Sequence, residues 1–254
     1  MAHKTLISGT AYSVTGGREL IGGTGYGCKA GKTLIGGTAF DVPFSKDVPL
    51  STVTPGAILM LNESGSDAQF SVAKHDYEAD LNGVGLTLIV KKGIYGPATA
   101  FGTSETRNSY VSSVINEKLK TYASTVIDER IREVIRTTKI PVTKGNTDQK
   151  IDTEKIIMDT KCFILSCTEL GYASNTSIFN VEGTKLPNAE ELRIAGQWTR
   201  TPYLRSTYDA FYVKDDLNGT TGLYISEKYI VPAFTLPATL AVVQNADGTY
   251  SLAA

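Results

Sequence analysis

A unit of fourteen residues occurs three times in succession near the start of the chain. Residues 4–14 (KTLISGTAYSV) return as residues 18–28 (RELIGGTGYGC) and again as residues 32–42 (KTLIGGTAFDV). Glycine pairs suit tight turns because glycine accepts a positive φ without steric cost, so each unit predicts two short strands joined by a turn. An even period keeps equivalent residues on one face of a strand. We therefore expect one set of equivalent apolar residues to form a docking face: Leu6, Tyr12, Leu20, Tyr26, Leu34 and Phe40.

These units are too small to bury much surface, and an isolated two-stranded ribbon is marginally stable in water. Two interpretations remain open. The repeats form either a self-contained meander or a docking element that gains its stability from a larger assembly. The sequence predicts a docking module over residues 1–44 and a second domain over residues 50–254, with Pro43 and Pro49 marking the linker between them.

The stretch GYGCKAGKT, residues 25–33, is close to a phosphate-binding loop but has the wrong spacing. Such a loop needs a glycine five residues before Gly31, and that position is Tyr26. A phosphate loop must also open a helix. The residues that follow, TLIGGTAF, favour strands and contain glycines that weaken a helix. The resemblance arises where two repeats meet, and no nucleotide cofactor is predicted.

The composition excludes several classes of protein. The net charge is −1 with 20% charged residues, so no basic excess points to nucleic acid or to an anionic membrane. No apolar run approaches the roughly 20 residues that span a bilayer, and the first residues, MAHKT, lack the pattern of a secretory signal. Cys28, Cys162 and Cys167 are too few and too unevenly spaced for a disulfide framework. We expect three free thiols in a reducing cytoplasm.

The remaining residues predict both strands and helix. Residues 57–75 predict a hairpin with its turn at 64–67, and residues 86–90 and 163–166 predict further strands. Residues 108–138 contain no glycine or proline and carry an amphipathic apolar stripe, which predicts a long helix or two helices separated by a break. The predicted fold class is therefore α+β, with a glycine-rich β-hairpin repeat module followed by a mixed α+β domain.

Several short sequence motifs in this second domain resemble, in their order and spacing, those of the DUF6273 family. That family is a domain of unassigned function common in phages and prophages of Clostridium-like bacteria. The repeats are similar to those that often precede this domain in phage proteins. One departure is Val231, which stands where the family usually has an arginine. The motifs are AKHDY (73–77), LNGVGLTLIV (81–90), YVSSVIN (110–116), FILSCTELG (163–171), VEGT (181–184), QWTRTP (197–202) and PAFTLP (232–237).

The resemblance implies a non-enzymatic structural protein of a bacteriophage particle, as a component of the tail, baseplate or tail fibre docked through its repeats. Its implied partners are other virion proteins and further copies of itself. A scaffold like that of C-type lectins and formylglycine-generating enzymes is one fold that the resemblance allows. The alternatives are a receptor-binding tip that recognises a host-surface glycan or protein, a cell-wall-degrading enzyme, and a decoration protein of the capsid or neck.

The densest group of aromatic and arginine residues lies near residues 198–212. Trp, Tyr and Arg dominate binding hot spots, and aromatic faces also stack on sugar rings. Two members have a competing interpretation, because Trp198 suits a core position and Arg200 suits bonds to backbone carbonyls. The candidate binding residues are Trp198, Arg200, Tyr203, Arg205 and Tyr208.

No pattern of catalytic or metal-binding residues is recognisable. The only histidines are His3 and His75, so a Ser/His/Asp set is not available. The segment 215–219 (DDLNG) is similar to the start of a calcium loop, yet Lys214 and Ile225 occupy positions that need acidic ligands. The sequence predicts no catalytic residue, no metal and no cofactor.

Overall fold

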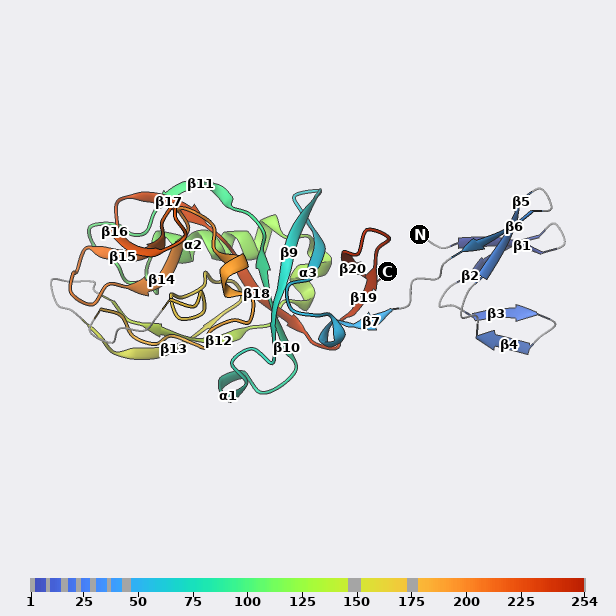
Figure 1. The fold of residues 1–254 in the computed structure, drawn as a ribbon, viewed down its shortest axis with the longest axis horizontal. Helices are drawn as coiled ribbons and strands as arrows, with labels where there is room; N and C mark the ends of the chain where they lie inside the picture. Colours follow the sequence, from blue (N-terminus) through green and yellow to red (C-terminus); the bar gives the residue numbers. More distant parts are fainter. Residues whose placement is uncertain are drawn as a thin grey trace.

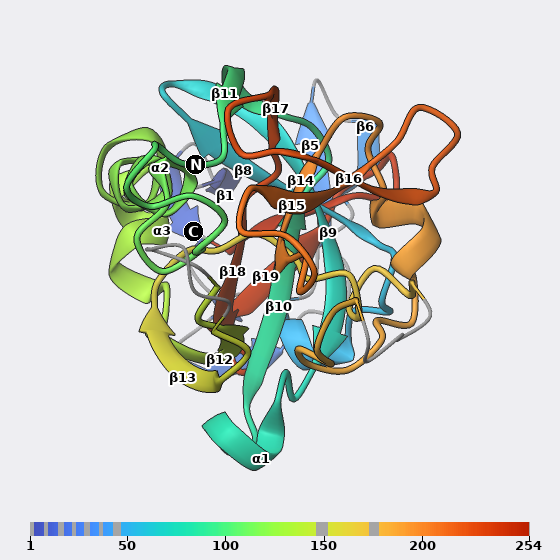
Figure 2. The same cartoon turned by 90° about the vertical axis from the view of Figure 1, so that its left-hand side faces the viewer.

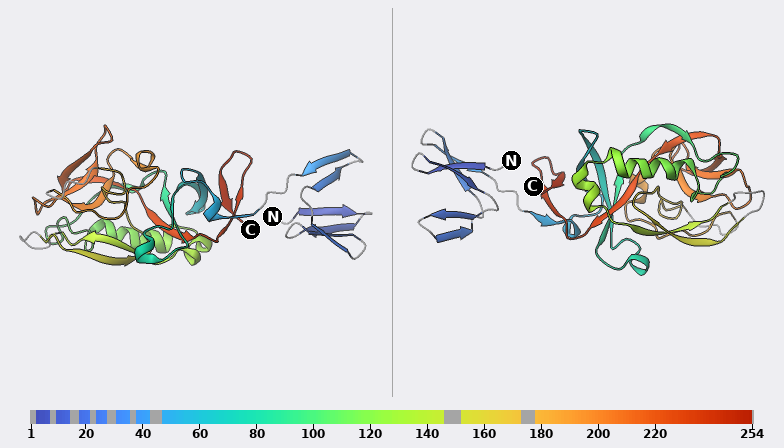
Figure 3. Two further views of the ribbon diagram at one scale, coloured as in Figure 1. Left: turned by 60° about the horizontal axis from the view of Figure 1, so that its bottom comes forward. Right: turned by 180° about the vertical axis from the view of Figure 1, so that it is seen from behind.

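A computed structural model describes residues 47–145, 152–172 and 178–253, together with the backbone of six short strands between His3 and Val42. These six strands form three antiparallel hairpins, drawn as separate ribbons in Figure 3: β1 (His3–Ile7) with β2 (Thr10–Val14), β3 (Arg18–Ile21) with β4 (Thr24–Gly27), and β5 (Gly31–Ile35) with β6 (Thr38–Val42).

The three hairpins share one register. Leu6 lies opposite Ala11, and the equivalent leucines in the second and third hairpins lie opposite Gly25 and Ala39. The two strands predicted for each unit are thus confirmed. The side chains of the six predicted docking residues lie outside the part that the structure describes, so the docking face stays a prediction.

The largest sheet in the described chain has seven strands and curls into a half-barrel (Figure 1). Neighbouring strands are antiparallel, apart from the parallel pair β20 and β8. The order across the sheet is β18 (Ala233–Pro237), β10 (Leu86–Lys91), β9 (Ser66–His75), β8 (Ile58–Glu63), β20 (Tyr250–Leu252), β19 (Ala241–Gln244) and β7 (Val48–Pro49).

The hairpin of β8 and β9 confirms the prediction for residues 57–75. Its turn residues, Ser64 and Gly65, both have positive φ, at 49° and 85°. Two such residues make the type of turn whose twist matches that of the flanking strands. The Asn62 side chain accepts a hydrogen bond from the Gly65 N–H at 2.9 Å, which holds the turn and fixes the register of the sheet.

Three smaller sheets and several short helices cover the half-barrel (Figure 2). The sheets are β14 (Trp198–Pro202), β15 (Asp209–Val213) and β16 (Gly219–Leu223); β12 (Thr138–Thr143) and β13 (Lys155–Thr160); and β11 (Tyr95–Ala100) and β17 (Glu227–Ile230). The helices are α1 (Ala79–Asn82), α2 (Val114–Thr121), the π-helix η2 (Tyr122–Val126), α3 (Glu129–Val134), and two 3₁₀ turns, η1 (Leu50–Thr52) and η3 (Ala189–Leu192).

The helix predicted over residues 108–138 is much shorter than its apolar stripe. It begins after Ser113, whose hydroxyl accepts the Asn116 N–H at 3.0 Å as an N-cap. It changes to a π-helix at Tyr122 and ends where Ile127 pairs with Glu63 at the tip of the β8–β9 hairpin. Of the two predicted alternatives, a long helix or two helices separated by a break, the structure shows the second, because this contact with the sheet separates α2 and η2 from α3.

The predicted fold class, α+β, is wrong. The chain is mostly β, with 39% strand against 15% helix, and its central feature is the half-barrel. The predicted scaffold like that of C-type lectins and formylglycine-generating enzymes was part of this α+β prediction and is rejected with it. The error has a local cause, because the strands β11, β12, β13, β16 and β17 lack a clear alternation of apolar and polar residues. Residues 163–166, predicted as a strand, contribute only an isolated bridge from Phe163 to Ala233.

A large core joins the half-barrel to the smaller sheets, and Cys167, Phe179 and Phe211 form a second, smaller cluster. Aromatic pairs mark the extent of the large core, from Phe70 against Phe234 on the half-barrel to Tyr77 stacked on Phe163 at a centroid distance of 5.7 Å. Because the core is continuous, the face presented by β14–β16 is held on a rigid support.

Candidate functional site

Burial divides the predicted binding group into two parts. Trp198 and Arg200 are 0% exposed, whereas Tyr208 is 48% exposed. Tyr203 is half-buried and Arg205 is exposed. The first two side chains are therefore part of the core, and only the loop that follows β14 offers side chains to a partner.

Trp198 fills the core between β11 and β15. Its indole N–H donates to the Thr99 carbonyl at 2.8 Å, and its ring lies edge-on to Phe101 and Tyr212 at centroid distances of 5.3 and 5.9 Å. The structural interpretation of this residue is the one that the geometry supports.

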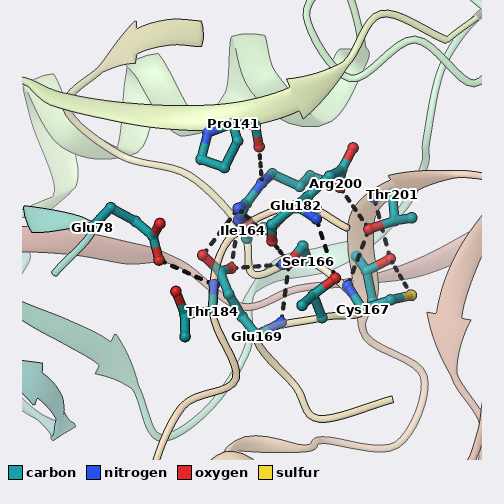
Figure 4. A network of polar contacts seen from close by, with 12 residues as sticks. Glu78, Pro141, Ile164, Ser166, Cys167, Glu169, Glu182, Thr184, Arg200 and Thr201 are labelled. Carbon is teal, nitrogen blue, oxygen red and sulfur yellow. Dashed lines mark hydrogen bonds and ion pairs between the residues drawn. The ribbon is translucent and has the colours of Figure 1, made fainter. Parts of the chain in front are cut away.

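Arg200 is at the centre of a buried polar network (Figure 4). Its Nη1 donates to Glu169 Oε2 at 2.6 Å and its Nη2 to Glu169 Oε1 at 2.9 Å. This is the two-pronged pairing that the planar guanidinium favours. Further donations reach the carbonyls of Pro141 at 3.2 Å and Ile164 at 3.0 Å, so the bonds to backbone carbonyls predicted for Arg200 are present as well.

Glu169 has additional partners on both carboxylate oxygens. The Tyr77 hydroxyl donates to Oε1 at 2.5 Å, and the Ser166 N–H donates to Oε2 at 2.9 Å. Tyr77 comes from the loop after β9 and Arg200 from β14. The carboxylate therefore ties the half-barrel to the sheet that covers it.

A second buried carboxylate, Glu182, completes the network. Its Oε1 accepts the Thr143 N–H at 2.6 Å, and its Oε2 accepts the Thr201 hydroxyl at 2.7 Å. The Thr201 hydroxyl in turn accepts the Cys167 N–H at 3.0 Å. Glu169 and Glu182 are both fully buried and fully bonded, so they brace the fold and do not face a substrate.

Burial controls the protonation of this network. It raises the pKa of Tyr77 well above 10.0, with a further rise from the charge of Glu169, so the phenol stays a neutral donor. For Arg200, burial alone would lower the pKa, but the adjacent Glu169 carboxylate outweighs burial and the net shift is upward. Burial also raises the pKa of Glu182 above its ordinary 4.5, although Arg200 and two hydrogen-bond donors oppose that rise.

The raised pKa of Glu182 predicts a specific pH dependence. As pH rises through 4.5, the unfolded chain loses this proton while the folded protein keeps it, so the group's contribution to stability is complete below 4.5 and is lost as pH rises through the folded pKa. We expect the free energy of unfolding of wild type, relative to Glu182→Gln, to fall as pH rises from 4.5 through the raised pKa of the folded protein. Denaturant titrations across this range measure the difference. A difference that grows with pH would contradict the assignment.

Exposed apolar side chains gather beside the β15–β16 hairpin. Tyr208, Leu223 and Ile225 are 48%, 49% and 60% exposed. Tyr208 stacks on Tyr224 at a centroid distance of 6.3 Å, and the Arg107 guanidinium lies 4.9 Å from the Tyr208 ring centroid. We call this surface the Tyr208 face; it comprises Arg107, Tyr208 and Tyr224, and the exposed Leu223 and Ile225 flank Tyr224 in the sequence.

The loop that carries Tyr208 is fixed by hydrogen bonds. The Asn108 side-chain amide donates to the carbonyls of Ser206 and Asp209 at 3.0 and 2.8 Å. The Tyr203 N–H donates to the Asp209 carbonyl at 3.0 Å, and the Tyr224 N–H donates to the Tyr208 carbonyl at 2.7 Å. The face is thus preformed, which lowers the entropy lost when a partner binds.

Sequence reasoning found part of these sites. Tyr208 was among the predicted binding residues, but Tyr224 and Ile225 were not, because they reach the face through the β15–β16 pairing. Glu169 and Glu182 lie within the quoted motifs and were not singled out. A glutamate inside the apolar stretch FILSCTELG was the one signal that pointed to a buried ion pair.

Within residues 47–145, 152–172 and 178–253, no three His, Cys, Asp or Glu side chains are close enough to hold a metal ion. Cys162 and Cys167 are free and buried, and burial raises the pKa of Cys167 to about 12. Cys28 lies outside the described residues. None of the described helices is long and apolar enough to cross a membrane.

The half-barrel, the buried Arg–Glu network and the preformed loop define a mainly β domain with an internal polar brace. A family profile, described as "Domain of unknown function (DUF6273)", matches residues 85–238, more than half of the chain. The chain belongs to the DUF6273 family. Tyr77 and the strands β8, β9, β19 and β20 lie outside the matched residues, although they complete the network and the sheet. A search of curated proteins and a search of solved structures give no match.

Proposed function

We propose that this protein is a non-enzymatic component of a bacteriophage particle, in the tail, baseplate or tail fibre, and that it acts by binding. The observation that carries a binding function is the Tyr208 face, an exposed aromatic and arginine surface on a loop fixed by hydrogen bonds. The assignment to a phage particle rests on the resemblance of the repeats and of the domain to phage proteins. The repeats would dock the protein to other virion proteins.

The chemistry of the Tyr208 face supports a protein contact. Tyrosine and arginine dominate hot spots, and tyrosine supplies large contact area at low entropic cost. The exposed Leu223 and Ile225, which flank Tyr224 in the sequence, add apolar area. The buried network supports the same function, because Glu169 and Glu182 are bonded inside the core and leave the domain rigid.

Receptor binding is the second candidate, and the stacked pair of Tyr208 and Tyr224 favours it. Flat aromatic faces also suit the C–H surface of a sugar ring. The two candidates differ in whether the Tyr208 face is covered in the assembled particle. Mass spectrometry of purified particles tests membership of the virion. Hydroxyl-radical footprinting of Tyr208 in intact particles then separates a covered assembly contact from an open receptor site.

We expect Tyr208→Ala combined with Ile225→Ser to abolish binding at this face while changing the free energy of unfolding by less than about 1 kcal/mol, because both side chains are largely exposed. Incorporation into particles and binding to host cells are the two readouts. Val84→Ser, at an exposed apolar residue beside α1, is the matched control. If the double variant assembles and binds cells as wild type does, the Tyr208 face has neither role.

A further inference from the structure

A cavity of about 450 Å³ lies between the helical segment and the end of β13, on the side of the body where Figure 2 shows α2 and α3 next to β13. Its volume is within the range of small-molecule sites. It does not include any residue of the Tyr208 face or of the buried network. The lining residues are Lys120, Ala123, Ser124, Arg132, Thr137, Met158, Asp159, Thr160, Lys161 and Cys162.

The charges around this cavity are mainly positive. Lys120, Arg132 and Lys161 supply three cations against the single carboxylate of Asp159. Lys120 pairs with Glu117 at 2.5 Å. Among the residues that the structure describes, neither Arg132 nor Lys161 forms an ion pair. Two cations at the cavity therefore lack an ion-pair partner within the described chain, and Asp159 is the one carboxylate among the lining residues.

Arg132 is held in place at the cavity wall by the π-helix. Its Nη1 donates to the Ser124 carbonyl, which has no helical donor because η2 ends at Val126. Its Nε is buried and has no hydrogen-bond partner within the described chain. An orphaned buried donor costs stability unless a ligand satisfies it.

The wall that carries Ala123 and Ser124 is firmly attached to the half-barrel. The Val126 carbonyl accepts the Ser64 N–H at 2.9 Å, and the Tyr122 hydroxyl donates to Glu63. Short π-helical segments occur frequently at functional sites, because the extra residue costs helix stability. Here the π-helix η2 presents the Ser124 carbonyl to Arg132, and this hydrogen bond positions the guanidinium.

We propose that this cavity binds a small organic anion, a carboxylate or phosphate ester with a short apolar group. Arg132 and Lys161 would bind the anionic head, and Ala123, Met158 and Cys162 would contact the apolar part. Burial raises the pKa of Cys162, so its thiol stays neutral and does not repel the anion. This site is independent of the binding function proposed for the Tyr208 face.

Three six-carbon probes test the proposal on the full chain: hexanoate, hexyl phosphate, and hexanamide, which matches hexanoate in shape but is neutral. Isothermal titration calorimetry measures affinity. The methyl resonance of Met158 reports binding at the cavity, and that of Met60 on β8 serves as an internal control. We expect saturable binding of hexanoate or hexyl phosphate, and at least about tenfold weaker binding of hexanamide, because it cannot form charge-assisted bonds. Whichever of the two anions binds with the higher affinity identifies the preferred head group, carboxylate or phosphate.

Variants separate this site from general anion binding. Arg132→Gln and Lys161→Gln should each weaken the anionic probes by about tenfold or more, while Lys92→Gln, at an exposed lysine elsewhere, should leave the affinity unchanged. Lys161→Gln keeps the test valid if Arg132→Gln impairs folding, because Lys161 is exposed. The proposal is overturned if no anionic probe saturates, if hexanamide binds equally well, or if Lys161→Gln binds as wild type does.

Discussion

Glu169→Gln is expected to lower the free energy of unfolding by about 3–5 kcal/mol, because it leaves the Arg200 guanidinium buried without a counter-charge. The amide would also place an N–H₂ group against the Arg200, Tyr77 or Ser166 donors that now face the carboxylate. The single tryptophan, Trp198, is buried, so its fluorescence follows unfolding in denaturant.

Glu182→Gln is the matched control for this change. It removes a buried carboxylate that forms no ion pair within the described chain, and its expected cost is about 1 kcal/mol or less at neutral pH. A further variant, Glu169→Leu with Arg200→Met, should be more stable than either single change, because removing both charges leaves neither one unpaired. Equal stabilities for Glu169→Gln and Glu182→Gln would show that the Arg200–Glu169 pair does not brace the fold.

Trp198→Ala should lower the free energy of unfolding by about 3–5 kcal/mol, the range for truncating a large buried aromatic residue. The change leaves a cavity between Phe101 and Tyr212 and leaves the Thr99 carbonyl without its donor. Trp198→Phe keeps most of the volume and should cost about 1–3 kcal/mol through the lost hydrogen bond and residual cavity. Circular dichroism replaces fluorescence as the probe for these variants. Stability close to wild type for Trp198→Ala would indicate that the indole fills a surface site.

The sequence predicted those elements whose pattern is local. The β8–β9 hairpin followed from its turn residues and flanking apolar runs, and the strand pairs of the repeats followed from the glycine spacing. The fold class failed because strands such as β11 and β17 pair with partners far along the chain. The position of the helix break at Ile127 likewise depends on a distant contact, its bridge to Glu63. The intrinsic propensity of a short segment for helix or strand predicts neither of these contacts.

The candidate sites show the same division. Trp198 and Tyr208 were found from residue type, but the type alone could not separate a core tryptophan from an exposed tyrosine ten residues later. The partnership of Arg200 with Glu169 and Tyr77 joins three distant segments. Arg132 and Lys161 meet at one cavity only because β13 returns beside the helices.

The short strand β7 is the first part of the half-barrel after the repeats, and it is bonded at the sheet edge through Val48 and Pro49 to β19. Tension applied from the repeats would therefore act first on this pairing and on the adjacent bonds of Leu50 and Ser51 to the carbonyls of Leu240 and Ala238. An edge strand loaded from its end detaches one hydrogen bond at a time. The bonds of β7 would therefore break before the applied force unfolded the aromatic core.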